Sequence, residues 1–223
     1  MNFAIRLTRE FSPRYIGLAS EINTYMDAYP EDVENYLSLY SQTYAAIKEA
    51  SPSTQVFVTF QWDDLNRLDG DGERYDIKWE QMEAFEPELD IWVISSYPYF
   101  FFETPRDIPE DYYTPLLNRT NKPLAVAEGG WTSQDVDVFT GTPSEQVEHL
   151  QTLNDQLGPR LVFLINLIYA DLEWESYQEI LSAQGNADDM GTLSYFTYLG
   201  LVKSDGTPKP ALEAWDELRE REQ

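Results

Sequence analysis

The sequence predicts an α/β fold in which helices cover both faces of a parallel sheet. Its 223 residues, 42% hydrophobic and 14% aromatic, are enough for one sizeable core in a single domain spanning residues 1–223. Short continuous apolar runs alternate with amphipathic stretches, as expected for buried strands that alternate with helices. No glycine-rich phosphate loop follows any run, which favours a closed barrel over an open nucleotide-binding sheet.

Five apolar runs are the predicted strands. They cover residues 14–20, 55–60, 90–95, 123–127 and 160–166, and a short helical stretch at Met1–Phe11 precedes the first. Each run is continuous and does not alternate with polar residues, so we expect both faces of each strand to be buried.

Helix signals separate the predicted strands. Pro30 at a first-turn position, followed by Glu31 and Asp32, opens an amphipathic stretch that continues to about Ala50. The same pattern predicts helices over residues 75–85, 109–118, 143–157 and 208–219. The strands also end in polar residues, at the edge that carries the active site in a (β/α) barrel.

The charge of the chain excludes several partners. With 40 Asp and Glu against 15 Lys and Arg, the net charge is −25, so we expect no nucleic-acid partner and no anionic membrane surface. No apolar run approaches the roughly 18 residues of a membrane span. A salt-rich habitat, an acidic medium and solubility are equally compatible with the acidity. Residues 1–7 lack a signal-peptide pattern, which leaves the localisation open.

No cofactor or metal is predicted. The chain has no Cys, and its one His, His149, falls in a polar helical stretch and is expected on the surface. The segment Asp69–Glu73 is similar to a calcium loop but departs from the helix-flanked pattern, so we expect a solvated turn.

Two glutamates differ from the others by their position. Glu21 directly follows the first predicted strand and Glu128 the fourth. Cleavage of a glycosidic bond requires such a pair of carboxylates, one as the acid and the other as nucleophile or base. Flat rings just beyond the strand ends could stack on sugars, although packing in loops explains each one equally well. These candidate substrate-binding residues are Trp62, Tyr97, Trp131, Tyr169 and Trp174.

Four segments resemble a known family in its order along the chain. Residues 15–23 (YIGLASEIN) are similar to the fourth-strand acid/base motif of clan A glycoside hydrolases, which are retaining (β/α)₈ TIM-barrel enzymes, and residues 123–131 (PLAVAEGGW) to their strand-seven nucleophile motif. Residues 94–99 resemble strand six of the endo-β-1,4-galactanase branch, and residues 200–211 resemble the closing turn and last helix of such barrels.

This resemblance implies a retaining glycosidase that acts on a polysaccharide or oligosaccharide. Glu128 corresponds to the nucleophile, Glu21 to the acid/base, and Tyr97 is expected near the nucleophile. The family has Asn directly before the acid/base, where this chain has Ser20. Asn23 is included among the candidate substrate-binding residues, although its position does not match that of the family's Asn.

The resemblance begins only at strand four. We therefore expect an incomplete barrel of strands four to eight, without the first three βα units, whose open edges favour self-association or pairing with a missing N-terminal segment. A noncatalytic carbohydrate-binding or inactive remnant is the main alternative function. A barrel enzyme that binds a metal through Asp63 and Asp64 is a second alternative, but no ligand motif supports it.

Overall fold

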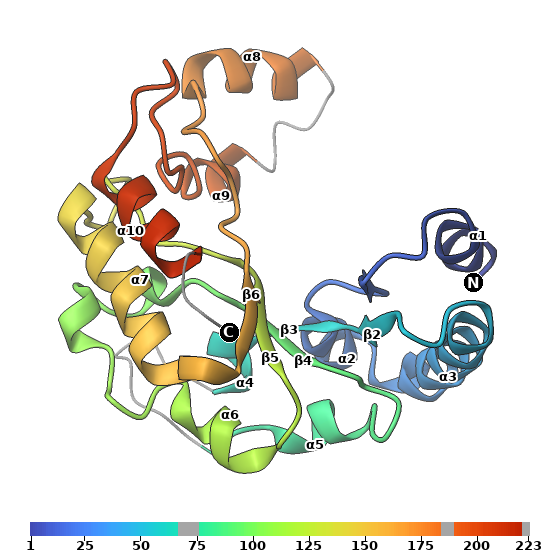
Figure 1. Ribbon diagram of the computed structural model, residues 1–223. Helices are drawn as coiled ribbons and strands as arrows, with labels where there is room; N and C mark the ends of the chain where they lie inside the picture. Colours follow the sequence, from blue (N-terminus) through green and yellow to red (C-terminus); the bar gives the residue numbers. More distant parts are fainter. Residues whose placement is uncertain (67–75, 184–189, 220–223) are drawn as a thin grey trace. The chain divides into compact units, whose positions relative to one another are not determined.

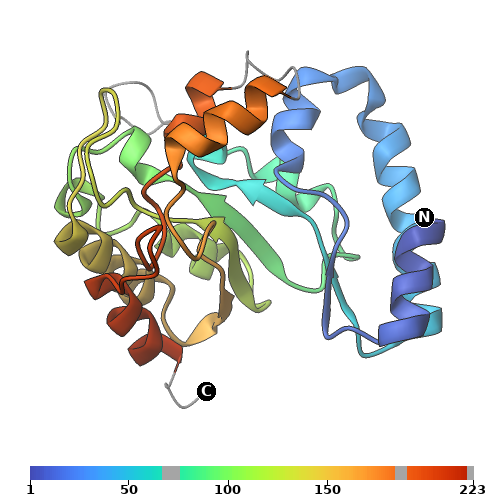
Figure 2. The ribbon, with the colours of Figure 1, turned by 90° about the horizontal axis from the view of Figure 1, so that it is seen from above.

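The computed structural model describes residues 1–66, 76–183 and 190–219 (Figure 1 and Figure 2). These residues form two compact units. Unit 1 comprises Met1–Ser96 and Asn121–Ala127, and unit 2 comprises Tyr97–Thr120 and Glu128–Gln223. The predicted turn at Asp69–Glu73 lies outside the described residues.

Unit 1 contains the first three predicted strands and the helices between them. Its elements in chain order are α1 (Asn2–Phe11), β1 (Tyr15–Gly17), α2 (Ile22–Ala28), the 3-10 helix η1 (Pro30–Asp32), α3 (Val33–Ala50), β2 (Gln55–Phe57), β3 (Thr59–Gln61), α4 (Trp62–Leu65), α5 (Trp79–Glu83), β4 (Trp92–Ser96) and the first part of β5 (Leu124–Gly129).

Unit 2 contains the end of β5 and elements on both sides of it in the chain. Before β5 come η2 (Pro98–Phe100), η3 (Pro105–Asp107) and α6 (Thr114–Arg119). After β5 come α7 (Pro143–Leu157), η4 (Gly158–Arg160), β6 (Leu161–Leu164), α8 (Trp174–Ala183), α9 (Met190–Ser194) and α10 (Pro210–Arg219). None of the described helices in either unit is long and apolar enough to cross a membrane.

The strands pair in parallel, as predicted. In unit 1, β1 pairs with β2 with Ile16 opposite Val56, and β3 pairs with β4 with Phe60 opposite Ile94. β4 lies between β3 and β5, and β5 continues into unit 2, where it neighbours β6. The described strands form a two-stranded and a four-stranded sheet, so the predicted α/β class and incomplete barrel are confirmed, and the barrel is not closed.

The predicted strand at 55–60 is two strands in the structure. The ladder breaks at the fully buried Val58, so that β2 pairs with β1 while β3 pairs with β4. The amide of Thr59 still donates to the carbonyl of Ala19, which extends the pairing of the first run beyond the regular strand.

Two predicted helices are shorter than expected. In the described part of this stretch, residues 76–85, only Trp79–Glu83 is helical, and the chain turns before Pro87, whose ring disfavours a helical residue ahead of it. In the 109–118 stretch the helix starts at Thr114, where Pro115 occupies the first turn without losing a hydrogen bond. The helix over 143–157 agrees with its predicted bounds.

Each unit has its own apolar core. In unit 1 the ring of Phe85, which is buried, contacts Phe60 and Tyr40 edge-on at centroid distances of 5.7 and 5.0 Å. In unit 2 the buried Leu150 of α7 packs with Leu201 and with Ala211 of α10. Burying one such aliphatic or aromatic side chain contributes about 1.5–3 kcal/mol, so these contacts stabilise the helices against the sheet.

His149 is buried, and its predicted surface position is wrong. Its side chain is 1% exposed, and its ring lies 5.6 Å from that of Trp131. The buried residues of α7 follow a helical period in which His149 shares a face with Gln146 and Leu153, a pattern that the polar neighbours obscured. Neither ring nitrogen hydrogen-bonds to another described residue, and burial lowers the pKa of His149 to about 3.

His149 should make the protein less stable in acid. Because the folded pKa lies below the ordinary value of about 6.5, only the unfolded state binds a proton between these values, and stability falls as the pH drops by up to about 1.4 kcal/mol per unit. We expect His149→Leu to reduce the stability lost between pH 6.5 and pH 5 by about 2 kcal/mol. Urea unfolding of both proteins at the two pH values measures this, and equal losses would contradict the prediction.

Candidate active site

Glu21 is held in a strained backbone conformation at the start of α2. Its φ of 47° and ψ of 48° are left-handed, a region that residues other than Gly rarely adopt and that costs about 1–3 kcal/mol. Its amide donates to the Thr59 hydroxyl at 2.8 Å, and its carboxylate accepts a hydrogen bond from the Ser95 hydroxyl at 2.6 Å. Side chains of β3 and β4 thus compensate the strain and fix the carboxylate.

Glu128 lies at the carboxyl end of β5. The hydroxyl of Tyr97, directly after β4, donates to Glu128 Oε1 at 2.5 Å, in agreement with the expected proximity of these residues. The Tyr97 side chain is buried, and its ring contacts Phe196 edge-on at a centroid distance of 5.1 Å. A packed phenol therefore sets the position of this partly buried carboxylate.

Three of the candidate substrate-binding residues, Asn23, Trp62 and Trp131, are buried. Trp62 begins α4, and its fully buried ring packs 6.0 Å from that of the half-buried Trp79 in unit 1. In unit 2 the ring of Trp131 packs against Tyr99 as well as His149. Both tryptophans take part in packing, and their predicted contact with sugar stays a prediction.

The side chain of Asn23 braces the backbone of unit 1. Its amide nitrogen donates to the Gln61 carbonyl and to Asp64, and its oxygen accepts the Gln61 N–H. The side chain is fully buried, and its expected role in substrate binding stays a prediction.

Tyr169 and Trp174 are the two candidate aromatic residues that remain accessible. Both follow β6 in unit 2. Tyr169 is 66% exposed, and Trp174 is half-buried at the start of α8, with its ring 6.2 Å from that of Tyr177. Their exposure is compatible with the predicted stacking on sugar.

A buried ion pair supports the loops of unit 2, and sequence reasoning missed it. Lys209 Nζ lies 2.5 Å from Asp171 and also donates to the hydroxyl of Ser133, and both charged side chains are at most 5% exposed. Ser133 follows β5, Asp171 follows β6 and Lys209 precedes α10, so the cluster joins three segments at one point. The sequence also did not single out Ser95 and Thr59 as the hydrogen-bond partners of Glu21, because a small hydroxyl residue in an apolar run carries no distinct signal.

No group of His, Cys, Asp or Glu among the described residues could hold a metal ion. The carboxylate of Asp63 accepts hydrogen bonds from Ser96 and Gln61, which gives it a structural role in unit 1.

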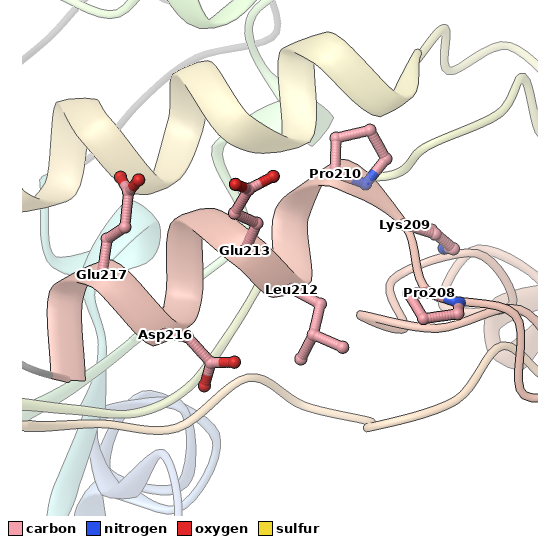
Figure 3. Close-up of a pocket in the computed structure, with 7 residues that line it drawn as sticks. All are labelled: Pro208, Lys209, Pro210, Leu212, Glu213, Asp216 and Glu217. Atoms are coloured by element: carbon pink, nitrogen blue, oxygen red, sulfur yellow. The ribbon is translucent and has the colours of Figure 1, made fainter.

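A pocket of about 570 Å³ lies at the start of α10 in unit 2 (Figure 3). None of the predicted site residues lines it: its lining is Pro208, Lys209, Pro210, Leu212, Glu213, Asp216 and Glu217.

Comparisons with solved structures identify the fold. The GH53 catalytic domain of Ignisphaera aggregans superimposes with a TM-score of 0.61 at 14% identity, covering 96% of this chain and 62% of that one. Xylanase 10B of Thermotoga petrophila, solved with xylobiose, gives 0.55 at 12% identity, covering 97% and 63%. The GH2 β-galacturonidase of Eisenbergiella tayi, bound to galacturonate, gives 0.53 at 17% identity, covering 86% and 32%.

The chain therefore has the fold of part of a TIM-barrel glycoside hydrolase. This confirms the structural likeness that the sequence motifs predicted. The chain spans about 62% of the length of the GH53 domain. Neither the comparison with protein-family models nor that with curated protein sequences found a match.

Replacing Lys209 should destabilise the folded protein. Lys209→Met leaves the buried Asp171 carboxylate without its counter-ion, and we expect a loss of about 3–5 kcal/mol in the free energy of unfolding. The double variant Lys209→Met, Asp171→Leu should lose less than Lys209→Met alone, because no buried charge is left unpaired. Denaturant unfolding measures both, and a loss below about 1 kcal/mol in Lys209→Met would place the pair among weak surface pairs.

Proposed function

We propose that this chain carries the catalytic residues of a retaining glycoside hydrolase, with Glu128 as the nucleophile and Glu21 as the acid/base. One observation carries the proposal: each glutamate follows or ends a strand of a parallel sheet, and each receives a short hydrogen bond from a hydroxyl at the end of β4. The two donors, Ser95 and Tyr97, are two residues apart in the sequence. The fold of a glycosidase barrel supports the assignment.

The proposed reaction is a double displacement. Glu21 donates a proton to the leaving oxygen while Glu128 attacks the anomeric carbon, which forms a glycosyl ester and releases the leaving sugar. Glu21 then takes a proton from water, and the resulting nucleophile cleaves the ester and regenerates Glu128. The Tyr97 hydrogen bond to Oε1 restricts rotation of the Glu128 carboxylate, which keeps the nucleophile oriented.

The substrate is a carbohydrate with β-glycosidic bonds, and Tyr169 and Trp174 are proposed to contact it. Their accessible rings in unit 2 have the flat apolar faces that stack on sugars. One feature favours the noncatalytic alternative: Ser20 is exposed and shorter than the Asn that the resembled family has before its acid/base.

Replacing the two glutamates should separate their roles. With a nitrophenyl β-glycoside, we expect Glu128→Gln to lower kcat at least about 10³-fold because the nucleophile is gone. Glu21→Gln should slow the steps that need proton transfer by about 10²- to 10⁴-fold. Azide should partly restore turnover by Glu21→Ala, since a small anion replaces the activated water.

Glu213→Gln, at an exposed position of α10, is the matched control and should leave the rate unchanged. Equal rates in all variants would mean that Glu21 and Glu128 are ordinary acidic residues. Sugar binding by the unaltered protein without turnover would favour the noncatalytic alternative.

Tyr97→Phe should weaken catalysis while the fold persists. The variant retains the packed ring and removes the hydroxyl that donates to Glu128, and a hydrogen bond to a charged group is worth about 1.5–3 kcal/mol. We expect kcat/KM to fall by roughly 10- to 150-fold. The same lost bond should lower the midpoint of thermal unfolding by about 3–12 °C, so the assay is run well below both midpoints. Tyr195→Phe, which also removes a phenol of unit 2 that binds a carboxylate, is the control. Similar rates in both variants would contradict a positioning role for Tyr97.

A further inference from the structure

Helix α1 of unit 1 exposes apolar side chains along one face. Phe3 and Phe11 are 74% and 71% exposed, and the half-buried Leu7 lies between them in the sequence. Positions spaced by four share a helical face, so these three side chains form a stripe along the whole of α1. Single exposed apolar residues are common on protein surfaces, whereas an apolar stripe is typical of a helix face that packs against another element.

The same helix carries the basic part of an acidic chain. Residues 1–14 hold three arginines and one glutamate, a net charge of +2, whereas the whole chain has −25. Arg6 and Arg9 line a groove of about 490 Å³ along α1. Arg6 pairs with Glu10 of the same helix at 2.8 Å, in an exposed position where such a pair is weak enough to exchange its partner. An acidic partner is therefore attracted to α1.

Helix α10 of unit 2 carries the complementary side chains. The pocket at its start combines three apolar residues with three carboxylates: Pro208, Pro210, Leu212, Glu213, Asp216 and Glu217. Glu213 and Glu217, both exposed and one turn apart, point to one side of the helix, and Leu212 points to another (Figure 3). Lys209 also lines the pocket, but its charge is neutralised by Asp171. The pocket thus offers apolar contact together with a net negative charge.

We propose that α1 of one copy of this protein binds the pocket at the start of α10 in a second copy. Each helix has ten residues and is about 15 Å long, so the two can pack along their full length. Arg6 and Arg9 are one turn apart, as are Glu213 and Glu217, so two ion pairs form beside the apolar contact. The ring of Phe3 leaves water in this arrangement and packs against Leu212 and the prolines.

The charge of the chain favours a second copy over other partners. Two copies with a net charge of −25 repel each other over most of their surfaces, and contact between α1 and α10 replaces part of this repulsion by attraction. A nucleic acid or an anionic membrane is attracted to α1 too, but the charge of the remaining chain opposes both. Because the two surfaces differ, association continues beyond a dimer unless the assembly closes into a ring.

Sedimentation equilibrium of the unaltered protein tests whether copies associate. Loading concentrations of about 10–500 µM bracket the weak association expected of a small interface. We expect the weight-average mass to rise with concentration above that of a single chain. Phe3→Ala should raise the Kd about 10-fold, because a phenyl ring is no longer removed from water. Val138→Ala truncates an equally exposed apolar side chain of unit 2, at 76%, and should leave the Kd unchanged.

A charge swap identifies the two surfaces. Arg6→Glu with Arg9→Glu makes α1 acidic, and Glu213→Arg with Glu217→Arg makes the α10 pocket basic. Each double variant alone should associate at least about 10-fold more weakly, since like charges then meet. An equimolar mixture should recover association, because acidic α1 meets the basic pocket and basic α1 meets the acidic pocket. Both variants keep a large negative net charge, so general attraction does not produce this recovery.

The matched control reverses two glutamates of another helix in unit 2. Glu175→Arg with Glu179→Arg, at exposed positions of α8, has the same spacing and the same change in net charge as the α10 variant, and should not weaken association. A monomer at every concentration, equal association of the α10 and α8 variants, or a mixture without recovery overturns the contact. None of these measurements uses hydrolysis, so their outcome is independent of the proposed function.

Discussion

Parallel pairing of strands that are buried on both faces is the constraint on which the other features depend. A parallel ladder needs helical crossovers, which bury the apolar runs, and it aligns the carboxyl ends of neighbouring strands. Thr59 and Ser95, which hold Glu21, are on paired strands whose register is set by such a ladder. A slip of one residue would turn these hydroxyls to the opposite face.

Hydroxyl groups hold both glutamates of the candidate site. Glu21 is held by Ser95 and Thr59, and Glu128 by Tyr97, so neither carboxylate relies on a cation for these contacts. A hydroxyl donor of this kind fixes the orientation of a carboxylate without itself adding a charge beside it. The buried Lys209–Asp171 pair supports the loops of unit 2 through a separate set of contacts.

The burial of several aromatic and histidine side chains was not evident from the residues next to them in the sequence. The rings of Trp62 and Trp131 follow strand ends, where a sugar-binding ring would also be found, but both are buried. His149 has polar neighbours in the sequence and yet faces Trp131. In each case the side chain's surroundings are supplied by segments distant in sequence, and no spacing rule within one element could reveal them. Tyr29 is the reverse case, an aromatic residue in an acidic loop that remains exposed.

The sequence by itself determined the strand and helix order, the parallel α/β class and the two strand-end glutamates, because continuous apolar runs, helix-start signals and order along the chain are local properties. The tertiary structure alone decided the break at Val58, the left-handed backbone of Glu21, and which hydroxyls hold the carboxylates. It also decided which aromatic rings are buried. These depend on register and on contacts between residues far apart in the chain, where burial and hydrogen bonding override local preference.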